Sequence, residues 1–296
     1  MLISIGCWSM AKRWRSFPWS AAAEMTALAT FLATKALSGL ISWQDQCQAA
    51  ADFELTLAAV EGRILENNLL PARYQRNQQM ISTPQQLRLL RSSVAVVGAG
   101  GLGGYILEEL ARLGVGQIVI IDDDVFEEHN LNRQLLASPA KLGRVKVEVA
   151  AERIAEINPA VTVRAVQARL DKAQGVSLLA GADCVVDAVD NVPSRLELEE
   201  LCEGLQVPLV HGAIGGWYGH VTTIFPGDRS LAKLYRHWSG GKGIEQQLGN
   251  PAFTPAVVAS FQVAEVCKIL LGQGRLLRNR QLNINLLDME VEEIPL

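Results

Sequence analysis

The stretch "VVGAGGLGGYILEELARLG", residues 96–114, decides the fold of this chain. A short apolar run leads into glycines in the pattern Gly98-x-Gly100-Gly101-x-Gly103, and an amphipathic helical pattern follows. Glycine lets the chain turn tightly between a strand and a helix, and it lets a phosphate approach the backbone amides at the helix N-terminus. The stretch therefore predicts the strand, turn and helix that open a nucleotide-binding βαβ unit.

Alternating strand and helix patterns continue from this stretch to the end of the chain. Strands are expected at 93–98, 117–122, 161–167, 183–189 and 207–212, with helices at 103–114, 143–158 and 194–205 between them. Later strands are expected at 219–225, 281–287 and 289–294, with a buried helix at 255–272. This order predicts an α/β fold of the Rossmann-like, doubly wound type, in which a mostly parallel sheet is extended by antiparallel strands.

Residues 1–72 carry a different pattern and are expected to form a helical N-terminal extension, ahead of a main domain at 73–296. Apolar residues at helical spacing predict two helices in this extension, at 16–38 and 45–67. Thr83 is expected to cap a further short helix at the start of the main domain. The extension is expected to pack on the main domain, to form a dimer contact or to dock a partner.

The composition is that of an ordinary globular protein. Of 296 residues, 49% are hydrophobic and 20% are charged, and the net charge is −4. No basic footprint is present, so we expect a cytoplasmic protein that binds neither nucleic acid nor a membrane. The uncharged run between Glu24 and Lys35 is too short to span a bilayer. The cysteines lack the spacing of a disulfide framework or a zinc ribbon and are expected to be buried and reduced: Cys7, Cys47, Cys184, Cys202 and Cys267.

Polar side chains beyond the second strand indicate which nucleotide binds. Asp122 ends that strand, where a carboxylate can accept hydrogen bonds from ribose hydroxyls, but this feature does not separate NAD from ATP. Arg133 and Lys146 favour ATP, because two cations suit a triphosphate whose negative charge moves onto departing pyrophosphate. Asn130 can donate to an α-phosphate oxygen, and Asp190, just past a strand end, can bind Mg²⁺. The structural alternatives are solvated surface cations and a helix N-cap at Asp190.

Five motifs together resemble the ThiF/MoeB/HesA family, the ubiquitin-activating-enzyme-like adenylyltransferases of sulfur-carrier proteins. They are RYQRN (73–77), VVGAGGLGG (96–104), IDDDVFEEHNLNRQ (121–134), LGRVKVE (142–148) and VVDAVDNVPSR (185–195). The resemblance covers residues 73–296 and implies an enzyme that uses ATP and Mg²⁺. Its expected substrate is a small ubiquitin-like carrier of the molybdopterin or thiamine type, whose C-terminal Gly-Gly carboxylate becomes an acyl-adenylate with release of pyrophosphate. The resemblance also implies a homodimer.

The same resemblance assigns roles to residues by position. Those that would line the phosphates and the ribose are Gly98, Gly100, Gly101, Gly103 and Asp122. Those that would hold the phosphates and stabilise the departing pyrophosphate are Asn130, Arg133 and Lys146. Asp190 would bind Mg²⁺, and Arg76 would reach the nucleotide from the other subunit of the homodimer.

Two departures from the family pattern limit what it implies. Many members bind a structural zinc with two CxxC pairs, but 225–238 and the C-terminus contain no cysteine, so no zinc is expected. Members that form a thioester or persulfide keep a cysteine ahead of the late helix, and 244–260 contains none. The reaction is therefore expected to stop at the acyl-adenylate, with sulfur supplied by another protein. "SGGKG" at 239–243 is expected to be a loop over the carrier's tail, with His211 and His220 either near that tail or purely structural.

Other functions stay open at this point. The acceptor of AMP can instead be a small carboxylate or a modified tRNA base, although the acidic balance disfavours RNA. The chain can also be a non-catalytic scaffold that retains an adenylation fold. An NAD-dependent oxidoreductase is disfavoured because no Tyr-x-x-x-Lys pair accompanies the glycine motif.

Overall fold

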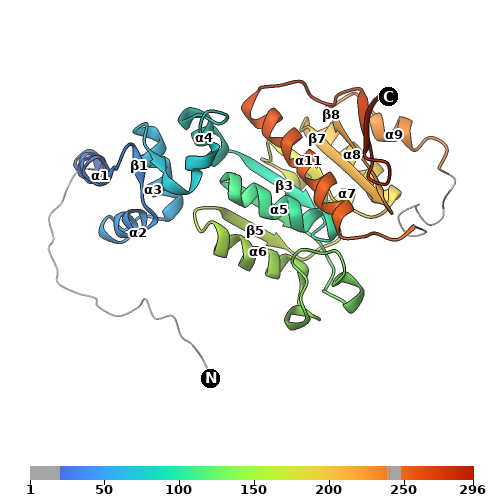
Figure 1. The fold of residues 1–296 in the computed structure, drawn as a ribbon, viewed down its shortest axis with the longest axis horizontal. Coiled ribbons are helices and arrows are strands. Elements are labelled where there is room, and N and C mark those ends of the chain that lie inside the picture. The colour runs from blue at the N-terminus through green and yellow to red at the C-terminus, as the bar shows by residue number, and fades with distance from the viewer. Residues whose placement is uncertain (1–20, 239, 241–247) are drawn as a thin grey trace.

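The computed structural model describes residues 21–238, 240 and 248–296 of the chain. These residues contain an eight-stranded sheet in the order β10-β9-β8-β7-β6-β3-β4-β5, with helices on both faces (Figure 1). Its strands are β3 (Ser93–Val97), β4 (Gln117–Ile121), β5 (Thr162–Val166), β6 (Cys184–Asp187), β7 (Leu209–Gly215), β8 (Tyr218–Ile224), β9 (Arg280–Asn285) and β10 (Glu290–Pro295). Strands β3 to β7 pair in parallel, and β8 to β10 extend the sheet antiparallel. The predicted fold class is confirmed.

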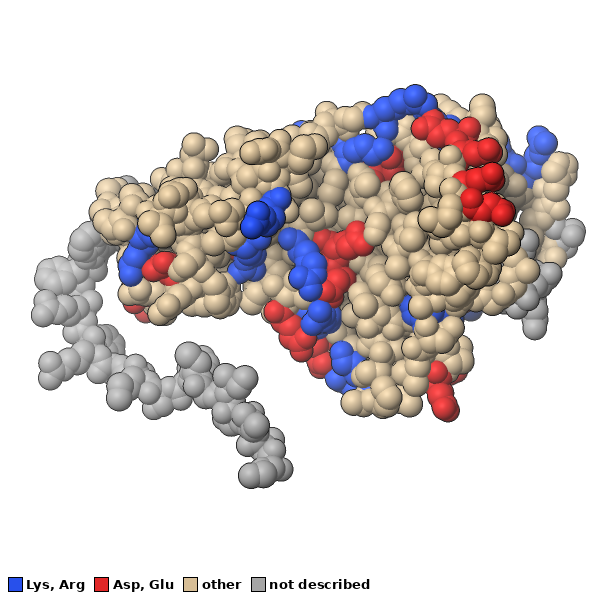
Figure 2. Space-filling view, viewed as in Figure 1, with Lys and Arg blue, Asp and Glu red and all other residues tan. Residues whose placement is uncertain are grey.

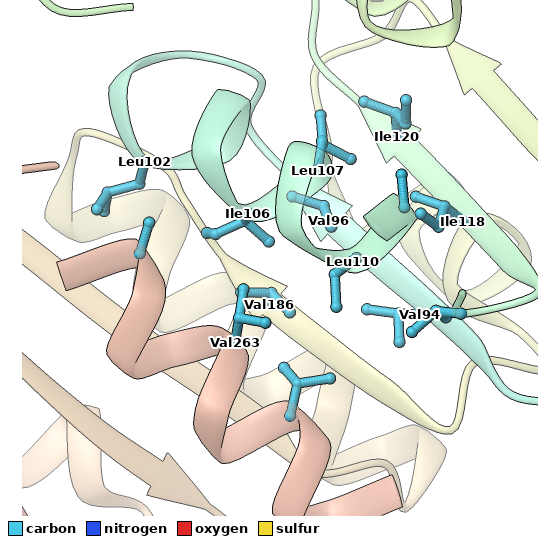
Figure 3. Close-up of a cluster of buried hydrophobic side chains, with 14 of the residues drawn as sticks. Val94, Val96, Leu102, Ile106, Leu107, Leu110, Ile118, Ile120, Val186 and Val263 are labelled. Carbon is cyan, nitrogen blue, oxygen red and sulfur yellow. The ribbon is translucent and has the colours of Figure 1, made fainter. Parts of the chain in front are cut away.

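Two apolar cores hold helices against the two faces of this sheet. One core joins the sheet to α5 (Gly101–Leu113), α6 (Lys146–Ile157) and α11 (Phe253–Leu271). Figure 3 shows α5 leucine and isoleucine side chains packed between the strands and α11. The other core joins the opposite face to α7 (Lys172–Leu179), α8 (Val192–Leu205) and α9 (Ser230–Leu234). The short helices α7 and α9 were not predicted, because their few turns carry no clear apolar period.

Helix α11 illustrates how burial separates a core helix from a membrane span. Within the described part of the chain it alone is long and apolar enough to cross a bilayer by composition. More than half of its apolar window is buried inside the protein. Its buried polar side chains are also hydrogen-bonded, since Gln262 donates to the carbonyl of Asp187 at 2.8 Å and Glu265 accepts from the backbone of Leu277 at 2.8 Å. These contacts make α11 part of the core.

The N-terminal extension differs from its prediction. Its helices are α1 (Ala21–Lys35), α2 (Trp43–Asp52) and α3 (Leu57–Glu66), so the single helix expected at 45–67 is wrong. Two N-caps explain the division, because Ser42 accepts from the backbone of Asp45 and Thr56 from that of Ala59. The part of the expected first helix at 16–20 lies outside the described residues.

The short helix of the main domain also begins one residue earlier than predicted. Helix α4 (Thr83–Leu90) is capped by Ser82, whose backbone N–H donates to the Gln85 side chain at 2.8 Å, and not by Thr83. A β1 (Leu40–Ile41) and β2 (Leu70–Pro71) pair precedes it, followed by the 3-10 turn η1 (Ala72–Asn77).

A buried polar cluster ties the extension to the main domain. The Tyr74 hydroxyl donates to Glu61 of α3 at 3.1 Å and accepts from Asn158, at the end of α6, at 2.8 Å. Arg73 forms an ion pair with Glu61 at 3.3 Å and also donates to Asn158. Burial is the main influence on Glu61 and raises the pKa of its carboxyl, although Arg73 and Tyr74 act to lower it. The extension and the main domain are therefore joined by hydrogen bonds as well as by apolar contact.

Candidate nucleotide site

A cavity of about 380 Å³ opens at the carboxyl ends of the parallel strands. Its walls come from the ends of β3 and β4 and from the segments that follow β5 and β6. Ligands of open α/β sheets bind at this edge, where neighbouring strands send their connections to opposite faces. Lining residues that the sequence had singled out are Gly98, Gly100, Gly101, Asp122, Arg133, Lys146 and Asp190.

The glycine loop is shaped by two close backbone approaches. Gly98 has a φ of +100°, and a Cβ there would lie 2.4 Å from the carbonyl oxygen of Ala188. A Cβ on Gly103 would lie 1.9 Å from the carbonyl oxygen of Gly98. Gly100 and Gly101 instead line the cavity, and a Cβ on either would meet its neighbours at ordinary distances. Thus Gly98 and Gly103 hold the loop against the sheet, while Gly100 and Gly101 expose backbone to the cavity.

The Asp122 carboxylate is fixed beside the glycine loop by two backbone donors. It accepts from Ala99 at 2.6 Å and from Asp124 at 2.8 Å. Burial is the largest influence and raises the pKa of Asp122, while Lys146 and the two backbone donors oppose that shift. Each carboxylate oxygen retains a lone pair that can accept from a ribose hydroxyl.

Lys146 enters the cavity from the first turn of α6. Its side chain is only 6% exposed, and its ammonium lies 2.8 Å from the Asp124 carboxylate. A β-bridge between Val125 and Val145 holds this segment beside the start of α6, and the backbone of Lys146 donates to Asp124 at 3.0 Å. The alternative that Lys146 is a solvated surface cation does not fit this burial.

Arg133 faces the same cavity with neutral partners. Its guanidinium donates to the carbonyl of His129 and to the side chain of Asn132, each at 2.9 Å. The neighbouring Gln134 is buried, lines the cavity, and has no partner for its Oε1 atom among the described residues. Among the residues that the structure describes, Arg133 therefore has no carboxylate that neutralises its charge.

Asp190 lies on the opposite wall, just beyond β6. It is exposed to the cavity, and Asn191 donates to one of its oxygens at 3.2 Å. The N-cap of α8 is Asn191, which accepts from Ser194 at 2.9 Å, so the alternative of an N-cap at Asp190 is wrong. A carboxylate facing a phosphate-sized cavity fits the oxygen ligation that Mg²⁺ prefers.

The carboxylates of Asp122, Asp123 and Asp124 form a second acidic group on the other wall, with ligand atoms within 4.8 Å of one another.

Three of the expected site residues do not line this cavity. Asn130 is buried, and its side chain accepts from the backbone of Glu127 at 2.9 Å, so it shapes the loop before Arg133. Gly103 packs behind the glycine loop. Arg76 is exposed on η1 and is not among the residues that line the cavity of its own chain.

Sequence reasoning missed other polar residues at the cavity. Arg169 lies beyond β5 and Arg195 on α8, and both line the wall. Arg169 could have been found by the rule that already selected Asp190, since it too follows the carboxyl end of a parallel strand. Arg195 had no such signal, because its role depends on partners from β6 and from the turn after α9, which lie apart in sequence.

The described cysteines show no sign of catalytic activation. Cys184, Cys202 and Cys267 are free thiols, Cys47 is partly buried, and Cys7 lies outside the described residues. Burial raises the pKa of Cys202 to about 12 and that of Cys267 to about 11. Buried, reduced thiols are confirmed for Cys184 and Cys202, while Cys47 and Cys267 are partly buried.

The glycine loop, the carboxylate beside it and the cations near the strand ends have the arrangement that is typical of a nucleotide-binding α/β protein. The chain belongs to the ThiF family, whose profile matches residues 74–296. It is 40% identical over 212 residues to the SAMP-activating enzyme E1 of Haloferax volcanii, spanning 71% of this chain and 78% of that protein. It is 38% identical over 196 residues to the molybdopterin-synthase adenylyltransferase of Salmonella typhimurium, spanning 64% of this chain and 77% of that protein.

A solved structure agrees with the fold. The crystal structure of E. coli MccB with ATP matches with a TM-score of 0.64 at 20% identity, covering 92% of this chain and 87% of that one. Such a likeness shows the adenylation fold alone. Because close sequence relatives are adenylyltransferases, the chain is an adenylyltransferase, and the resemblance to the ThiF/MoeB/HesA family is confirmed.

Proposed function

We propose that this enzyme uses ATP and Mg²⁺ to adenylate the C-terminal Gly-Gly carboxylate of a small ubiquitin-like sulfur carrier of the molybdopterin or thiamine type. The observation that carries the proposal is the pairing, in one cavity, of an exposed glycine loop with Arg133 and Lys146 on one side and Asp190 on the other. A dinucleotide needs no such cations, whereas a triphosphate that loses pyrophosphate does. Relatives named for sulfur-carrier proteins and for molybdopterin synthase support the choice of substrate.

The cavity residues account for each part of the reaction. Backbone amides of Gly100 and Gly101 receive the phosphates, and Asp122 accepts from the ribose hydroxyls. The carrier's carboxylate attacks the α-phosphate, the bond to the β-phosphate breaks, and pyrophosphate leaves. Arg133 and Lys146 stabilise the charge that develops on it. Asp190 would hold Mg²⁺, which would supply further charge neutralisation.

The proposal extends to the assembly of the enzyme. Arg76 is exposed and does not line the cavity of its own chain, as expected for a residue that completes the site of a second copy. We therefore propose a cytoplasmic homodimer, with residues 1–72 as a helical extension of the adenylation domain. The visible face in Figure 2 shows Lys and Arg interspersed with Asp and Glu, without a continuous basic patch that RNA would need. No zinc is proposed, and metal analysis after chelation that found one equivalent would contradict this.

ATP–pyrophosphate exchange tests the proposal directly. The purified chain, Mg²⁺ and candidate carriers ending in Gly-Gly are incubated with labelled pyrophosphate, and label entering ATP is measured. Exchange that requires the carrier's intact C-terminal Gly-Gly supports carboxylate adenylation and names the carrier. ATP binding without exchange for any carrier shifts the acceptor to a small carboxylate or a modified tRNA base. If the chain does not bind ATP, the remaining hypothesis is a non-catalytic scaffold that retains the adenylation fold.

A further inference from the structure

The 3-10 turn η1, which carries the exposed Arg76, is held only weakly by its own hydrogen bonds. It has six residues, its N-cap Pro71 makes no side-chain hydrogen bond, and 3-10 hydrogen bonds have poorer geometry than those of an α-helix. The shape of η1, and with it the direction of the Arg76 side chain, therefore depends on the elements that pack against this turn.

Helices α5 and α6 connect the nucleotide cavity to the buried side of η1. Both helices begin at the cavity. At their other ends, a Cβ on Gly114 would lie 2.4 Å from the Tyr74 hydroxyl, and Asn158 donates to that hydroxyl at 2.8 Å. With 13 and 12 residues, the helices are each about 18–20 Å long. Arg76 follows Tyr74 by two residues, so it starts about a helix length from the cavity of its own chain, which suits a role in a second copy.

The N-terminal extension also contacts the buried side of η1, through Glu61 of α3. One oxygen of this buried carboxylate accepts from the Tyr74 hydroxyl at 3.1 Å, and the other lies 3.3 Å from the guanidinium of Arg73. These two partners are consecutive residues of η1, and Arg73 also donates to Asn158. Removal of the carboxylate would leave a buried hydroxyl and a largely buried guanidinium short of a partner. Glu61 therefore helps to fix the turn that carries Arg76.

The extension does not act on the cavity of its own chain by direct contact. Within the described part of the chain, the residues that line the nucleotide cavity all follow residue 96. An effect of Glu61 on adenylation must therefore pass through η1, and a residue on η1 serves whichever cavity Arg76 enters.

We propose that the N-terminal extension positions Arg76 for the active site of a second copy, with Glu61 as the positioning residue. The inference rests on the proposed adenylation by a homodimer. Glu61 holds Tyr74 and Arg73, and these hold the turn from which Arg76 reaches the triphosphate of the other copy. An arginine supplied in trans to a phosphoryl transfer is worth about 10³–10⁵ in rate, and misplacement of a reacting group by about 1 Å costs about 100-fold.

Mixed dimers of full-length chains test this role, because they separate the chain that supplies Arg76 from the chain that supplies the cavity. The cavity chain carries Arg76→Ala and keeps its nucleotide site. The arginine chain keeps Arg76 and carries Arg133→Ala with Asp190→Asn. Two different affinity tags isolate the mixed dimer, which retains one complete site, and ATP–pyrophosphate exchange is measured with a carrier that the wild-type enzyme activates.

Glu61→Ala is then added to either chain of this mixed dimer. On the arginine chain it is expected to lower exchange on the order of 100-fold, as a misplaced catalytic group would. On the cavity chain it is expected to leave exchange unchanged. A general loss of folding would act from either chain and does not produce this difference. Glu61→Gln on the arginine chain is expected to recover most of the exchange, because its amide oxygen can accept from the Tyr74 hydroxyl.

Glu66→Ala is the matched control. Glu66 is a second glutamate on α3, and its ion pairs are with Arg63 and Arg91, outside η1. Its substitution is expected to leave exchange unchanged from either chain.

The other outcomes decide against specific steps. Equal loss from either chain, or no loss from either, overturns the positioning role of Glu61, and loss confined to the cavity chain assigns the extension to its own site instead. A mixed dimer without exchange, beside an active wild-type enzyme, refutes the supply of Arg76 in trans and this inference with it. Absence of exchange by the wild-type enzyme with every carrier refutes the adenylation itself. If Glu61→Ala does not fold, Tyr74→Phe, which removes only the hydroxyl, gives the same comparison.

Discussion

Two adjacent glycines in α5, Gly103 and Gly104, allow a test of how the glycine loop is held. A Cβ on Gly103 would lie 1.9 Å from the carbonyl oxygen of Gly98, so loop and helix must separate by more than an ångström. A Cβ on Gly104 would lie 3.5 Å from its nearest neighbours, the side chains of Leu135 and Leu136, which is ordinary contact. Both sites are inside the same helix, so alanine gains about 1 kcal/mol of helix propensity at each.

The two alanine variants should therefore differ in stability by the clash alone. Forced contacts in a packed interior cost about 1–3 kcal/mol and sometimes more, so Gly103→Ala is expected to lose about 2 kcal/mol net. Gly104→Ala is expected to lie between no change and about 1 kcal/mol of gain. Because the displaced carbonyl belongs to Gly98, Gly103→Ala should also weaken ATP binding.

Urea unfolding followed by circular dichroism measures the first effect, and calorimetric titration with ATP measures the second. Equal unfolding midpoints for Gly103→Ala and Gly104→Ala would refute the idea that close backbone approach fixes this loop. Equal midpoints with weaker ATP binding only in Gly103→Ala would place Gly103 at the nucleotide instead.

Three further predictions concern the nucleotide site and the buried cluster. Arg133→Ala is expected to lower the rate of pyrophosphate exchange by about 100- to 1,000-fold, or about 3–4 kcal/mol of transition-state stabilisation, and unchanged exchange would remove Arg133 from the mechanism. Asp190→Asn is expected to raise the Mg²⁺ concentration for half-maximal exchange at least about tenfold, and an unaltered Mg²⁺ titration would move the metal to other ligands. The pKa of Glu61 is raised in the folded state, so its contribution to stability is complete below the unfolded value near 4.5 and is lost as pH rises through the raised value. Urea midpoints at about pH 5 and about pH 8 should therefore show Glu61→Gln gaining relative to wild type as pH rises, and a constant difference would contradict the raised pKa.

The parallel half of the fold was predictable because its signals are local. The apolar runs that form β3 and β4 are buried on both faces and are separated by one helix that ends at Gly114, whose φ is +77°.

The division between α2 and α3 was missed for an equally local reason. Apolar residues continue at helical spacing through Phe53 and Leu55, and only the cap at Thr56 marks a new start.

The candidate site was predictable where its residues follow strand ends in sequence order. Asp122 and Asp190 could be placed because each comes directly after an apolar run. His211 and His220 could not be paired from spacing, because their contact depends on the antiparallel register that sets Ala213 opposite His220. Arg195 likewise meets Tyr235 only when α8 and the turn after α9 fold onto one face of the sheet.

The ionic partners of Arg133 and Lys146 differ, and this difference explains why substitution of Arg133 is the clearer test of transition-state stabilisation. Lys146 is already paired with Asp124, so a triphosphate must compete with that carboxylate for the ammonium, or draw Asp124 away into solvent, where it is 66% exposed. Arg133 is held by a carbonyl and an amide, which orient the guanidinium, and no carboxylate in the described part of the chain compensates its charge. A positioned, uncompensated cation requires little rearrangement when pyrophosphate gains charge, and preorganisation of this kind is what lowers a barrier. We therefore expect Arg133 to supply the larger share of transition-state stabilisation, and we expect the charge of Lys146 to become available as the nucleotide enters.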